Sequence, residues 1–166
     1  MKVYFFILYF IPILWIGCGS VQDLSNPDRP PLVKTDRGPL YVYPGTKIPY
    51  NGEFSMSFED GEKLKFGIKD GVKHGRFQRW YPSGQIHEEY NLFKKQRDGL
   101  QRSWYPNGQL RLEANFRKGI CINAKTWTIS GAIASKVEEG TGIMVLFHAD
   151  GKKDRESIYK DGIKIN

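Results

Sequence analysis

The stretch GRFQRWYPSGQI, residues Gly75–Ile86, is followed 24 residues later by GLQRSWYPNGQL, residues Gly99–Leu110. Both stretches contain Trp-Tyr-Pro, one polar residue, Gly-Gln and an aliphatic residue in the same order. A fixed period of about this length is typical of repeat proteins, in which each unit buries its apolar face only against its neighbours. The sequence therefore predicts a repeat architecture.

The repeat is seen most clearly when a turn glycine is taken as the register mark. The turn glycines are Gly61, Gly84, Gly108, Gly131 and Gly151. Nine residues earlier, four units have an opening glycine, at Gly52, Gly75, Gly99 and Gly142. We expect a repeat domain over residues 50–165, with units near 50–73, 74–97, 98–121, 122–141 and 142–165.

Each unit is predicted to be a β-hairpin, because the residues before the turn glycine suit tight turns and the segment after it alternates. Ile86, Glu88, Tyr90 and Leu92 are expected on one side of the second unit, and Leu110, Leu112, Ala114 and Phe116 on one side of the third. The expected fold is all-β: about five β-hairpins in one elongated, twisted antiparallel sheet, preceded by a signal peptide and a flexible tether.

The opening glycine, the aromatic pair, the turn and a closing Lys-Gly resemble the MORN repeat. More narrowly, the pattern is similar to the bacterial variant found in lipoproteins and in the group named YwqK-family antitoxins. The resemblance covers about residues 50–165 and implies a solenoid of β-hairpins with aromatic residues along a groove. The antitoxin label would imply that the protein neutralises a toxin by binding it.

The N-terminus has the pattern of a secretory signal. Lys2 precedes fourteen uncharged residues, Val3–Ile16, and then Gly17 and Cys18. Ile16-Gly17-Cys18 resembles the end of a bacterial lipobox, although Trp15 stands where that motif prefers an aliphatic residue. We expect residues 1–17 to be a lipoprotein signal peptide and Cys18 to carry the lipid; an ordinary cleaved signal or an uncleaved anchor are the alternatives. An acylated Cys18 would anchor the exported chain to a bacterial membrane, at the outer membrane or the periplasmic face.

Residues 18–49 are predicted to be a proline-rich tether, because the prolines prevent a regular helix or strand ladder. Residues 40–49 begin with the apolar run Leu40–Tyr43 and are expected to form an N-terminal cap on the repeats, or else a first strand.

The net charge is +7, and residues 61–118 hold 13 Lys or Arg against 6 Asp or Glu. A basic segment of this kind suits an acidic protein, anionic lipid or nucleic acid. Export makes nucleic acid an improbable partner, so we expect none.

No pattern in the sequence predicts catalysis. His74, His87 and His148 occupy unrelated repeat positions, and neighbouring strand residues such as Glu88 and Glu89 point to opposite faces. Motifs for phosphate loops, serine hydrolases and zinc proteases are absent from the sequence. We therefore expect no enzyme activity, metal, cofactor or small-molecule substrate.

The aromatic ladder of the repeats is the best candidate for a binding site. We expect one ring of each Trp-Tyr pair to pack against the next hairpin and the other to line a groove, rimmed by basic residues that include Lys125. The candidate partner-binding residues are Arg79, Trp80, Tyr81, Arg102, Trp104, Tyr105 and Trp127.

The function expected from these features is a non-catalytic envelope lipoprotein whose repeat sheet is a binding scaffold for a protein partner. The alternatives are peripheral contact with an anionic membrane surface through the basic segment 61–118, and antitoxin-like neutralisation of a toxin.

Overall fold

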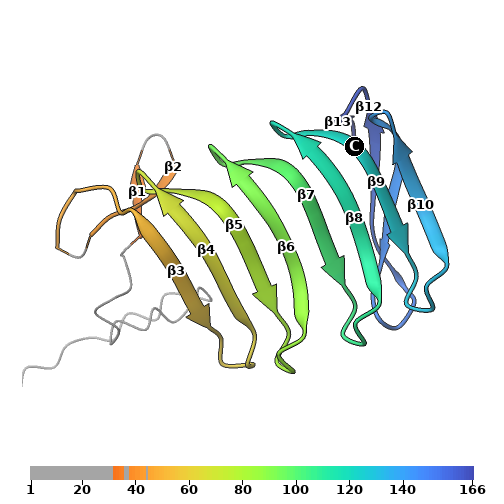
Figure 1. The fold of residues 1–166 in the computed structure, drawn as a ribbon, viewed down its shortest axis with the longest axis horizontal. Coiled ribbons are helices and arrows are strands. Elements are labelled where there is room, and N and C mark those ends of the chain that lie inside the picture. The colour runs from red at the N-terminus through yellow and green to blue at the C-terminus, as the bar shows by residue number, and fades with distance from the viewer. Residues whose placement is uncertain (1–31, 36–37, 44) are drawn as a thin grey trace, which may run out of the picture.

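The structure, a computed structural model, describes residues 32–35, 38–43 and 45–166. Thirteen β-strands and no helix occur among these residues. Eleven strands, β3 to β13, form one antiparallel sheet in which each strand lies beside its neighbours in the sequence (Figure 1). The prediction of an all-β fold with sequential hairpins in one long antiparallel sheet is confirmed.

The strands of the large sheet are β3 (Gly52–Ser57), β4 (Lys63–Lys69), β5 (Val72–Trp80), β6 (Ile86–Phe93), β7 (Gln96–Trp104), β8 (Leu110–Arg117), β9 (Ile120–Trp127), β10 (Ile133–Glu138), β11 (Thr141–Phe147), β12 (Lys153–Lys160) and β13 (Ile163–Lys164). A separate two-stranded sheet contains β1 (Leu32–Thr35) and β2 (Gly38–Tyr41). The predicted signal peptide, Cys18 and the first part of the predicted tether lie outside the described residues.

At one end of the large sheet, the strands are joined by turns that contain the repeat motif. In the second unit, the Gly84 N–H donates to the Tyr81 carbonyl and the Tyr81 N–H donates to the Gln85 carbonyl, both at 2.9 Å. Gly84 has a φ of 83°. This is a type I turn closed by a glycine bulge, which explains why the repeat needs glycine at this position.

At the opposite end, two-residue turns join the remaining strand pairs. Both residues of each turn have positive φ, as a type I′ turn requires. These turns are Asp70–Gly71, Lys94–Lys95, Lys118–Gly119, Glu139–Gly140 and Asp161–Gly162. In the second unit, Lys95 therefore takes a left-handed conformation that glycine takes in the other four.

A β-bulge follows the motif turn in every unit after the first. The extra residues are His87, Arg111, Ala134 and Asp154. The bulge places Ile86 opposite Trp80, on the other face from Tyr90. The prediction that Ile86 and Leu110 share a face with the alternating residues after them is therefore wrong, because one extra residue reverses the alternation.

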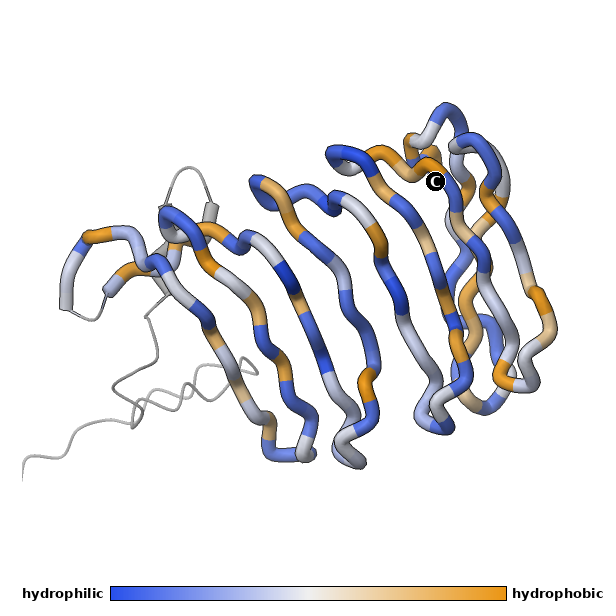
Figure 2. Tube along the Cα trace, viewed as in Figure 1, coloured by the Kyte–Doolittle hydropathy of each residue, from blue (hydrophilic) through white to orange (hydrophobic). Residues whose placement is uncertain are grey.

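One row of directly paired residues crosses the sheet from β3 to β10. This inner row is Phe54, Phe66, Phe77, Tyr90, Gln101, Ala114, Ala124 and Val137. All its members except Tyr90 are buried. We call the face that carries this row the inner face, and the opposite face the outer face. Hydrophobic and hydrophilic residues follow one another along the strands (Figure 2).

The inner face carries two separate apolar clusters. The first is aromatic and contains the buried residues Phe54, Phe66, Ile68 and Phe77. The second contains Leu112, Ala114, Phe116, Cys121, Ala124, Val137, Met144 and Leu146. Strands β6 and β7 lie between the clusters, so the middle of the inner face is not covered by either.

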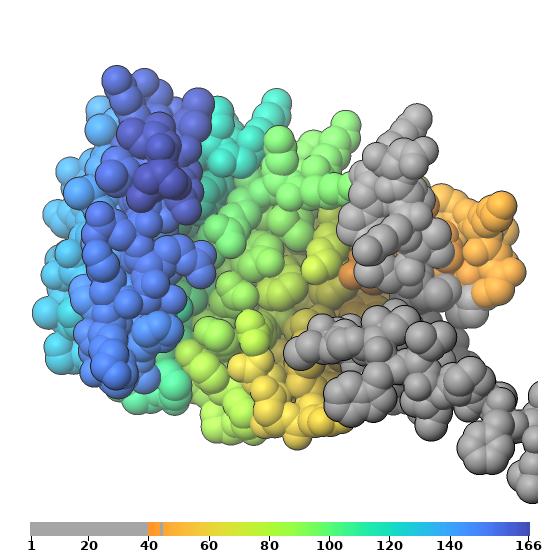
Figure 3. All heavy atoms as spheres, turned by 180° about the vertical axis from the view of Figure 1, so that it is seen from behind, coloured from red at the N-terminus to blue at the C-terminus, as the bar shows by residue number. Residues whose placement is uncertain are grey.

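The C-terminal part of the sheet curls back over its inner face. The Arg111 side chain on β8 donates from Nε to the Phe147 carbonyl at the end of β11, at 2.9 Å, and forms an ion pair with Asp154 on β12. Viewed from behind, the last strands stand forward of the middle strands and leave a hollow beside them (Figure 3). The inner face of β6 and β7 is thus the floor of a concave surface.

The segment around residues 40–50 packs on the first aromatic cluster. The Tyr41 ring lies 5.8 Å from the rings of both Phe54 and Phe66, and the Tyr41 N–H donates to the Gly71 carbonyl at 2.8 Å. Val42, 3% exposed, forms an isolated bridge with Pro49. The described residues of this segment, 40–43 and 45–49, therefore contact the start of the large sheet without adding a strand to it. In the described part of the chain, no helix has the length and apolar character needed to cross a membrane.

Candidate functional site

The structure separates the basic residues that were predicted to rim one groove. On the outer face, one row of directly paired residues crosses the sheet through Glu89, Arg102, Glu113 and Lys125. Arg79 pairs with Leu64 and Glu88 and lies on the inner face. A single groove rimmed by Arg79, Arg102 and Lys125 does not exist, because Arg79 occupies a strand position of opposite parity.

The three tryptophans lie on the outer face at equivalent positions. Each follows an inner-face residue of its strand: Trp80 follows Arg79, Trp104 follows Ser103 and Trp127 follows Thr126. Their side chains are half-buried, and the Lys125 ammonium lies 5.9 Å from the centre of the Trp127 ring. The charges of this face are largely paired, in Lys65–Glu53, Arg76–Glu89, Arg102–Glu113 and Lys136–Glu138.

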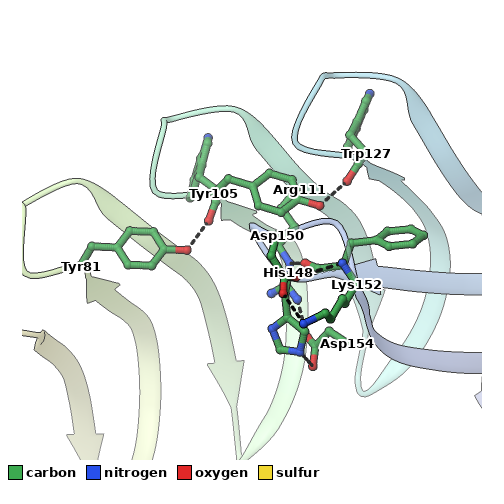
Figure 4. A network of polar contacts seen from close by, with 10 residues as sticks. Tyr81, Tyr105, Arg111, Trp127, His148, Asp150, Lys152 and Asp154 are labelled. Carbon is green, nitrogen blue, oxygen red and sulfur yellow. Dashed lines mark hydrogen bonds and ion pairs between the residues drawn. The ribbon is translucent and has the colours of Figure 1, made fainter.

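The two tyrosines of the motif link neighbouring repeats. The Tyr81 hydroxyl donates to the Trp104 carbonyl and the Tyr105 hydroxyl donates to the Trp127 carbonyl, each at 2.8 Å (Figure 4). Tyr105 is 1% exposed, so it cannot touch a partner while the sheet is intact. The next carbonyl in this series, that of Phe147, accepts from Arg111 instead.

Between the two apolar clusters, the inner face is polar. We call this region the inner trough; its floor is Glu88, Tyr90, Gln101 and Ser103, and Arg97 and Arg155 stand beside it. Glu88 pairs with Ser103, and Tyr90 pairs with Gln101. Gln101 and Ser103 are 4% and 5% exposed. Two buried polar side chains at the centre of a sheet face need hydrogen-bond partners.

One of these two side chains has a polar atom without a hydrogen-bond partner among the described residues. Gln101 Oε1 is buried and has no hydrogen-bond partner there, and the same holds for Nδ1 of His87, whose ring stacks on Tyr81 at 4.3 Å. Burial, followed by the charge of Arg79, lowers the pKa of His87, so its imidazole is neutral near neutral pH. Because Gln101 Oε1 is itself buried, its missing hydrogen bond belongs to the interior of the sheet and is closed to a ligand while the sheet is intact.

Four arginines surround the trough, and two of them have no carboxylate partner among the described residues. Arg79 forms an ion pair with Glu62, and Arg111 with Asp154. Arg97 and Arg155 form no ion pair with any residue of the described part. The Arg97 guanidinium lies 5.1 Å from the centre of the Tyr90 ring and 5.7 Å from that of Phe116.

The titration of the trough residues reflects this setting. Burial raises the pKa of the Glu88 carboxyl, while the charges of Arg97, Arg79, Arg111 and Arg155 act in the opposite direction. Burial, with a further contribution from Glu88, raises the pKa of Tyr90 to about 12. Folding therefore partly desolvates the Glu88 carboxyl and brings it under the electrostatic influence of four guanidinium groups.

A pocket of about 290 Å³ adjoins the trough next to the type I′ turns. It is lined by Arg97, Phe116, Gly119, Ile120, Tyr159, Gly162, Ile163 and Lys164. The pocket has apolar walls, and Arg97 and Lys164 supply two cations. Because Arg97 belongs to both, the pocket and the trough form one continuous surface.

The described residues contain no group of three or more His, Cys, Asp or Glu side chains placed to hold a metal ion. Cys121 is fully buried, and burial raises its pKa to about 11. Its thiol is therefore protonated at neutral pH and cannot act as a thiolate nucleophile.

Sequence reasoning missed Arg97, Gln101 and Arg155 as site residues. A signal for Gln101 exists in the repeat register. Two residues after the opening glycine, the other units have apolar residues, at Phe54, Phe77 and Met144, and all of these are buried. Gln101 occupies the same position in the third unit, so a polar residue replaces an apolar one at a core position. Arg155 has no such signal, because its approach to the trough depends on the curl of the sheet.

The comparisons with known proteins agree with the repeat pattern. Residues 73–95 and 97–118 match the family model described as "MORN repeat variant". The comparison with curated proteins gave no significant match.

Among solved structures, the chain resembles part of the structure titled "Crystal structure of GtfA/B complex bound to UDP and GlcNAc". The identity is 10%, the TM-score is 0.20, and the match covers 68% of this chain and 21% of that one. The chain thus spans about a fifth of that protein, and a TM-score this low does not establish a shared fold. The residues of the trough floor lie within the two segments, 73–95 and 97–118, that match the MORN repeat variant model.

Proposed function

We propose that the protein is a non-catalytic scaffold that binds a protein partner in the inner trough. The observation that carries this proposal is the concave inner face, on which Arg97 and Arg155 are exposed and form no ion pair with a carboxylate of the described residues. Exposed guanidiniums of this kind have donors free for hydrogen bonds to an acidic group of a partner.

The outer face is the weaker candidate. Its tryptophans are half-buried, and most of its charged residues pair with one another. These pairs leave little net charge on the outer face itself, so contact of that face with anionic lipid is the weaker proposal.

We also propose that the scaffold is an exported bacterial lipoprotein, held on its membrane through a lipid on Cys18. The support is the signal-like N-terminus that ends in Gly17-Cys18. Mass spectrometry of the mature chain is expected to find a diacylated N-terminal Cys18, and Cys18→Ala is expected to release the protein from the membrane fraction. An intact residue 1–18 segment in the wild-type protein would overturn this part of the proposal.

The binding proposal is tested by capture from envelope extracts with three forms of the full chain. The trough variant is Arg97→Glu/Arg155→Glu, and the matched outer-face control is Arg102→Glu/Lys125→Glu. We expect the wild type and the control to retain one specific partner and the trough variant to lose it. Loss with the outer-face variant alone would overturn the proposal. If the retained partner is a toxin that the scaffold inactivates, the protein acts as an antitoxin of the YwqK type.

A further inference from the structure

The last long strand of the sheet, β12, has an edge that is only partly covered. β13 pairs with β12 at Tyr159 and Lys160, and the Ile165 N–H donates to the Ile158 carbonyl at 2.9 Å. Among the described residues, the rest of β12, towards Lys153, has no neighbouring strand on this side. An edge of this kind presents main-chain donors and acceptors that can pair with another strand.

The alternation of an antiparallel ladder shows which main-chain groups of β12 point outwards. The Ile158 N–H donates to the Asn166 side chain, so the main chain of Ile158 faces away from β11. Glu156 lies two residues earlier and therefore points the same way. Its partner on β11, Val145, accordingly turns its own N–H away from β12 and donates to Ser135 on β10. The outward Glu156 N–H has no hydrogen-bond partner in the described part of the chain.

The side chain of Asn166 shows what this edge can bind. Its Oδ1 accepts from the Ile158 N–H at 2.7 Å, and its Nδ2 donates to the Glu156 carbonyl at 3.4 Å. One amide group thus supplies both the donor and the acceptor that the main chain of a further strand would supply. The Glu156 N–H, next along the edge, is open to the same kind of partner.

The charged side chains beside this edge are mostly paired with one another. The ion pairs are Lys152–Asp150, Lys153–Glu156 and Arg111–Asp154. Arg155 is exposed and forms no ion pair with a described residue. Because the net charge of residues 150–156 is therefore small, main-chain hydrogen bonds rather than the sign of a charge select what binds here.

The free edge of β12 faces the concave side of the molecule. The ion pair of Arg111 on β8 with Asp154 on β12 holds β12 over the inner face of the sheet. The sheet curls in the order β10, β11, β12, so the side of β12 away from β11 turns towards the hollow beside the last strands (Figure 3). A strand added there would lie over the inner trough.

We infer that the protein partner binds as an extended segment that adds a β-strand to the free edge of β12. The segment accepts a hydrogen bond from the Glu156 N–H, and every second side chain points towards the trough floor. This inference rests on the proposed function, because it names the way in which the partner binds in the same trough.

Glu156→Pro tests the main-chain contact in the full chain. Proline removes the outward N–H and obstructs an added strand, but it leaves the ladder with β11 intact, because the Glu156 N–H takes no part in that ladder. We expect the variant to keep the circular dichroism spectrum of the wild type. Glu156→Ala is the matched control, because it loses the same carboxylate and keeps the N–H.

The probe is a random decapeptide library, selected on the immobilised full chain. We expect the best peptide to bind the wild type and Glu156→Ala with equal affinity in fluorescence anisotropy. Glu156→Pro is expected to bind it at least about tenfold more weakly, as for the loss of a hydrogen bond in a strand pair. Equal affinity for Glu156→Pro and Glu156→Ala overturns the inference, and so does a library that yields no peptide bound by the wild type.

An N-methyl scan of the best peptide distinguishes strand addition from other modes of binding. Since only every second N–H of an added strand faces β12, the largest losses of affinity are expected at alternate positions. Losses without this alternation overturn the inference. Should Glu156→Pro not fold, hydrogen exchange of the Glu156 amide in the wild type decides: slower exchange with bound peptide supports the inference, and unchanged exchange overturns it.

A second copy of the chain is the competing occupant of this edge. Self-association of the wild type in analytical ultracentrifugation that Glu156→Pro abolishes would assign the edge to that second copy and overturn the inference. These results concern only the mode of binding. Failure of the proposed function is seen separately, as capture of the envelope partner that does not depend on Arg97 and Arg155.

Discussion

At the scale of single residues, the repeat is held together by hydrogen bonds from one unit to the next. Tyr105 is fully buried and its hydroxyl donates to the Trp127 carbonyl at 2.8 Å. Tyr105→Phe removes this donor, together with the hydroxyl oxygen that accepts a hydrogen bond from Arg111, and keeps the ring. We expect the free energy of unfolding to fall by about 1 kcal/mol, measured by urea denaturation.

The control for this change is Tyr43→Phe. Tyr43 is 40% exposed and its hydroxyl makes only a long contact of 3.4 Å with the Asn51 carbonyl. We expect no measurable change in stability. Equal effects at Tyr105 and Tyr43 would show that the hydroxyl-to-carbonyl link between repeats contributes nothing.

Glu88 gives a prediction about pH. Because burial raises its pKa in the native state above the ordinary value of 4.5, the native state favours the protonated carboxyl. The contribution of Glu88 to stability is therefore fully present below the ordinary pKa and is lost as the pH rises through the raised value. Glu88→Gln is expected to raise the melting temperature at neutral pH, with a difference that shrinks as the pH falls from the raised pKa to 4.5 and levels off below 4.5.

The melting temperatures of wild type and Glu88→Gln across this pH range provide the measurement. A stabilisation by Gln that is constant with pH would mean that titration is not its cause. A lower melting temperature for Glu88→Gln at neutral pH would mean that the four arginines outweigh burial.

How far single residues can be predicted from the sequence depends on whether their role is repeated. The Trp-Tyr pairs are visible because they recur, and the alternation of strand residues places the two rings of each pair on opposite faces. Gln101 stands out only when the units are aligned on their glycines, and nothing near it in the chain shows that its Oε1 lacks a partner. Whether a buried polar atom lacks a hydrogen-bond partner depends on how the whole sheet packs around it.

At the scale of the hairpins, the two turn types make different demands on the chain. Lys95 has a φ of 70°, in a position that is glycine in the other four type I′ turns. A non-glycine residue in this conformation costs roughly 1 kcal/mol. Lys95→Gly is therefore expected to raise the free energy of unfolding by about 1 kcal/mol, measured by urea denaturation.

The matched control makes the reverse substitution, lysine for glycine, at the second residue of another type I′ turn. Gly119 has a φ of 85°, and a Cβ built there would meet only the Gln96 side chain at an ordinary distance of 3.7 Å. Gly119→Lys is thus strained by its backbone alone, and we expect a loss of about 1 kcal/mol. A stabilising Gly119→Lys would show that the turn is not of type I′.

The hairpins themselves can be predicted from the sequence, because turn dipeptides and alternation are local signals. The bulges cannot be predicted in this way. His87 and Arg111 look like ordinary members of alternating strands, and only the pairing with the next strand shows that each is an extra residue. That is why the faces of Ile86 and Leu110 are reversed relative to the prediction.

At the scale of the whole molecule, the curl of the sheet creates the trough. Arg111 and Asp154 belong to β8 and β12, and their side chains are 14% and 22% exposed. Arg111→Met leaves Asp154 without its partner and removes the donor to the Phe147 carbonyl. We expect a loss of about 2 kcal/mol in the free energy of unfolding.

The double variant Arg111→Met/Asp154→Leu distinguishes the ion pair from simple packing. Removing both charges is expected to restore part of the stability that Arg111→Met loses, because no half-buried charge remains unpaired. If the stability losses of Arg111→Met and Asp154→Leu simply add up in the double variant, the two side chains do not interact, and β8 and β12 do not meet as described.

The long sheet follows from the sequence, but its curvature does not. Repeats of nearly constant length predict stacked hairpins, whereas the contact of β8 with β11 and β12 joins residues 36 and 43 positions apart. No local pattern shows such a contact in advance. The trough floor depends on the repeats, and Arg155 reaches it only because the sheet curls.

The measurement that tests the trough as the binding surface most directly is photocrosslinking in intact cells. A photoreactive residue is placed in the full chain at Ile120 or Lys164, in the pocket that adjoins the trough, and at Arg102 or Lys125 on the outer face. We predict that the same partner is crosslinked from both pocket positions and from neither outer position. Crosslinking from the outer positions alone would contradict the account.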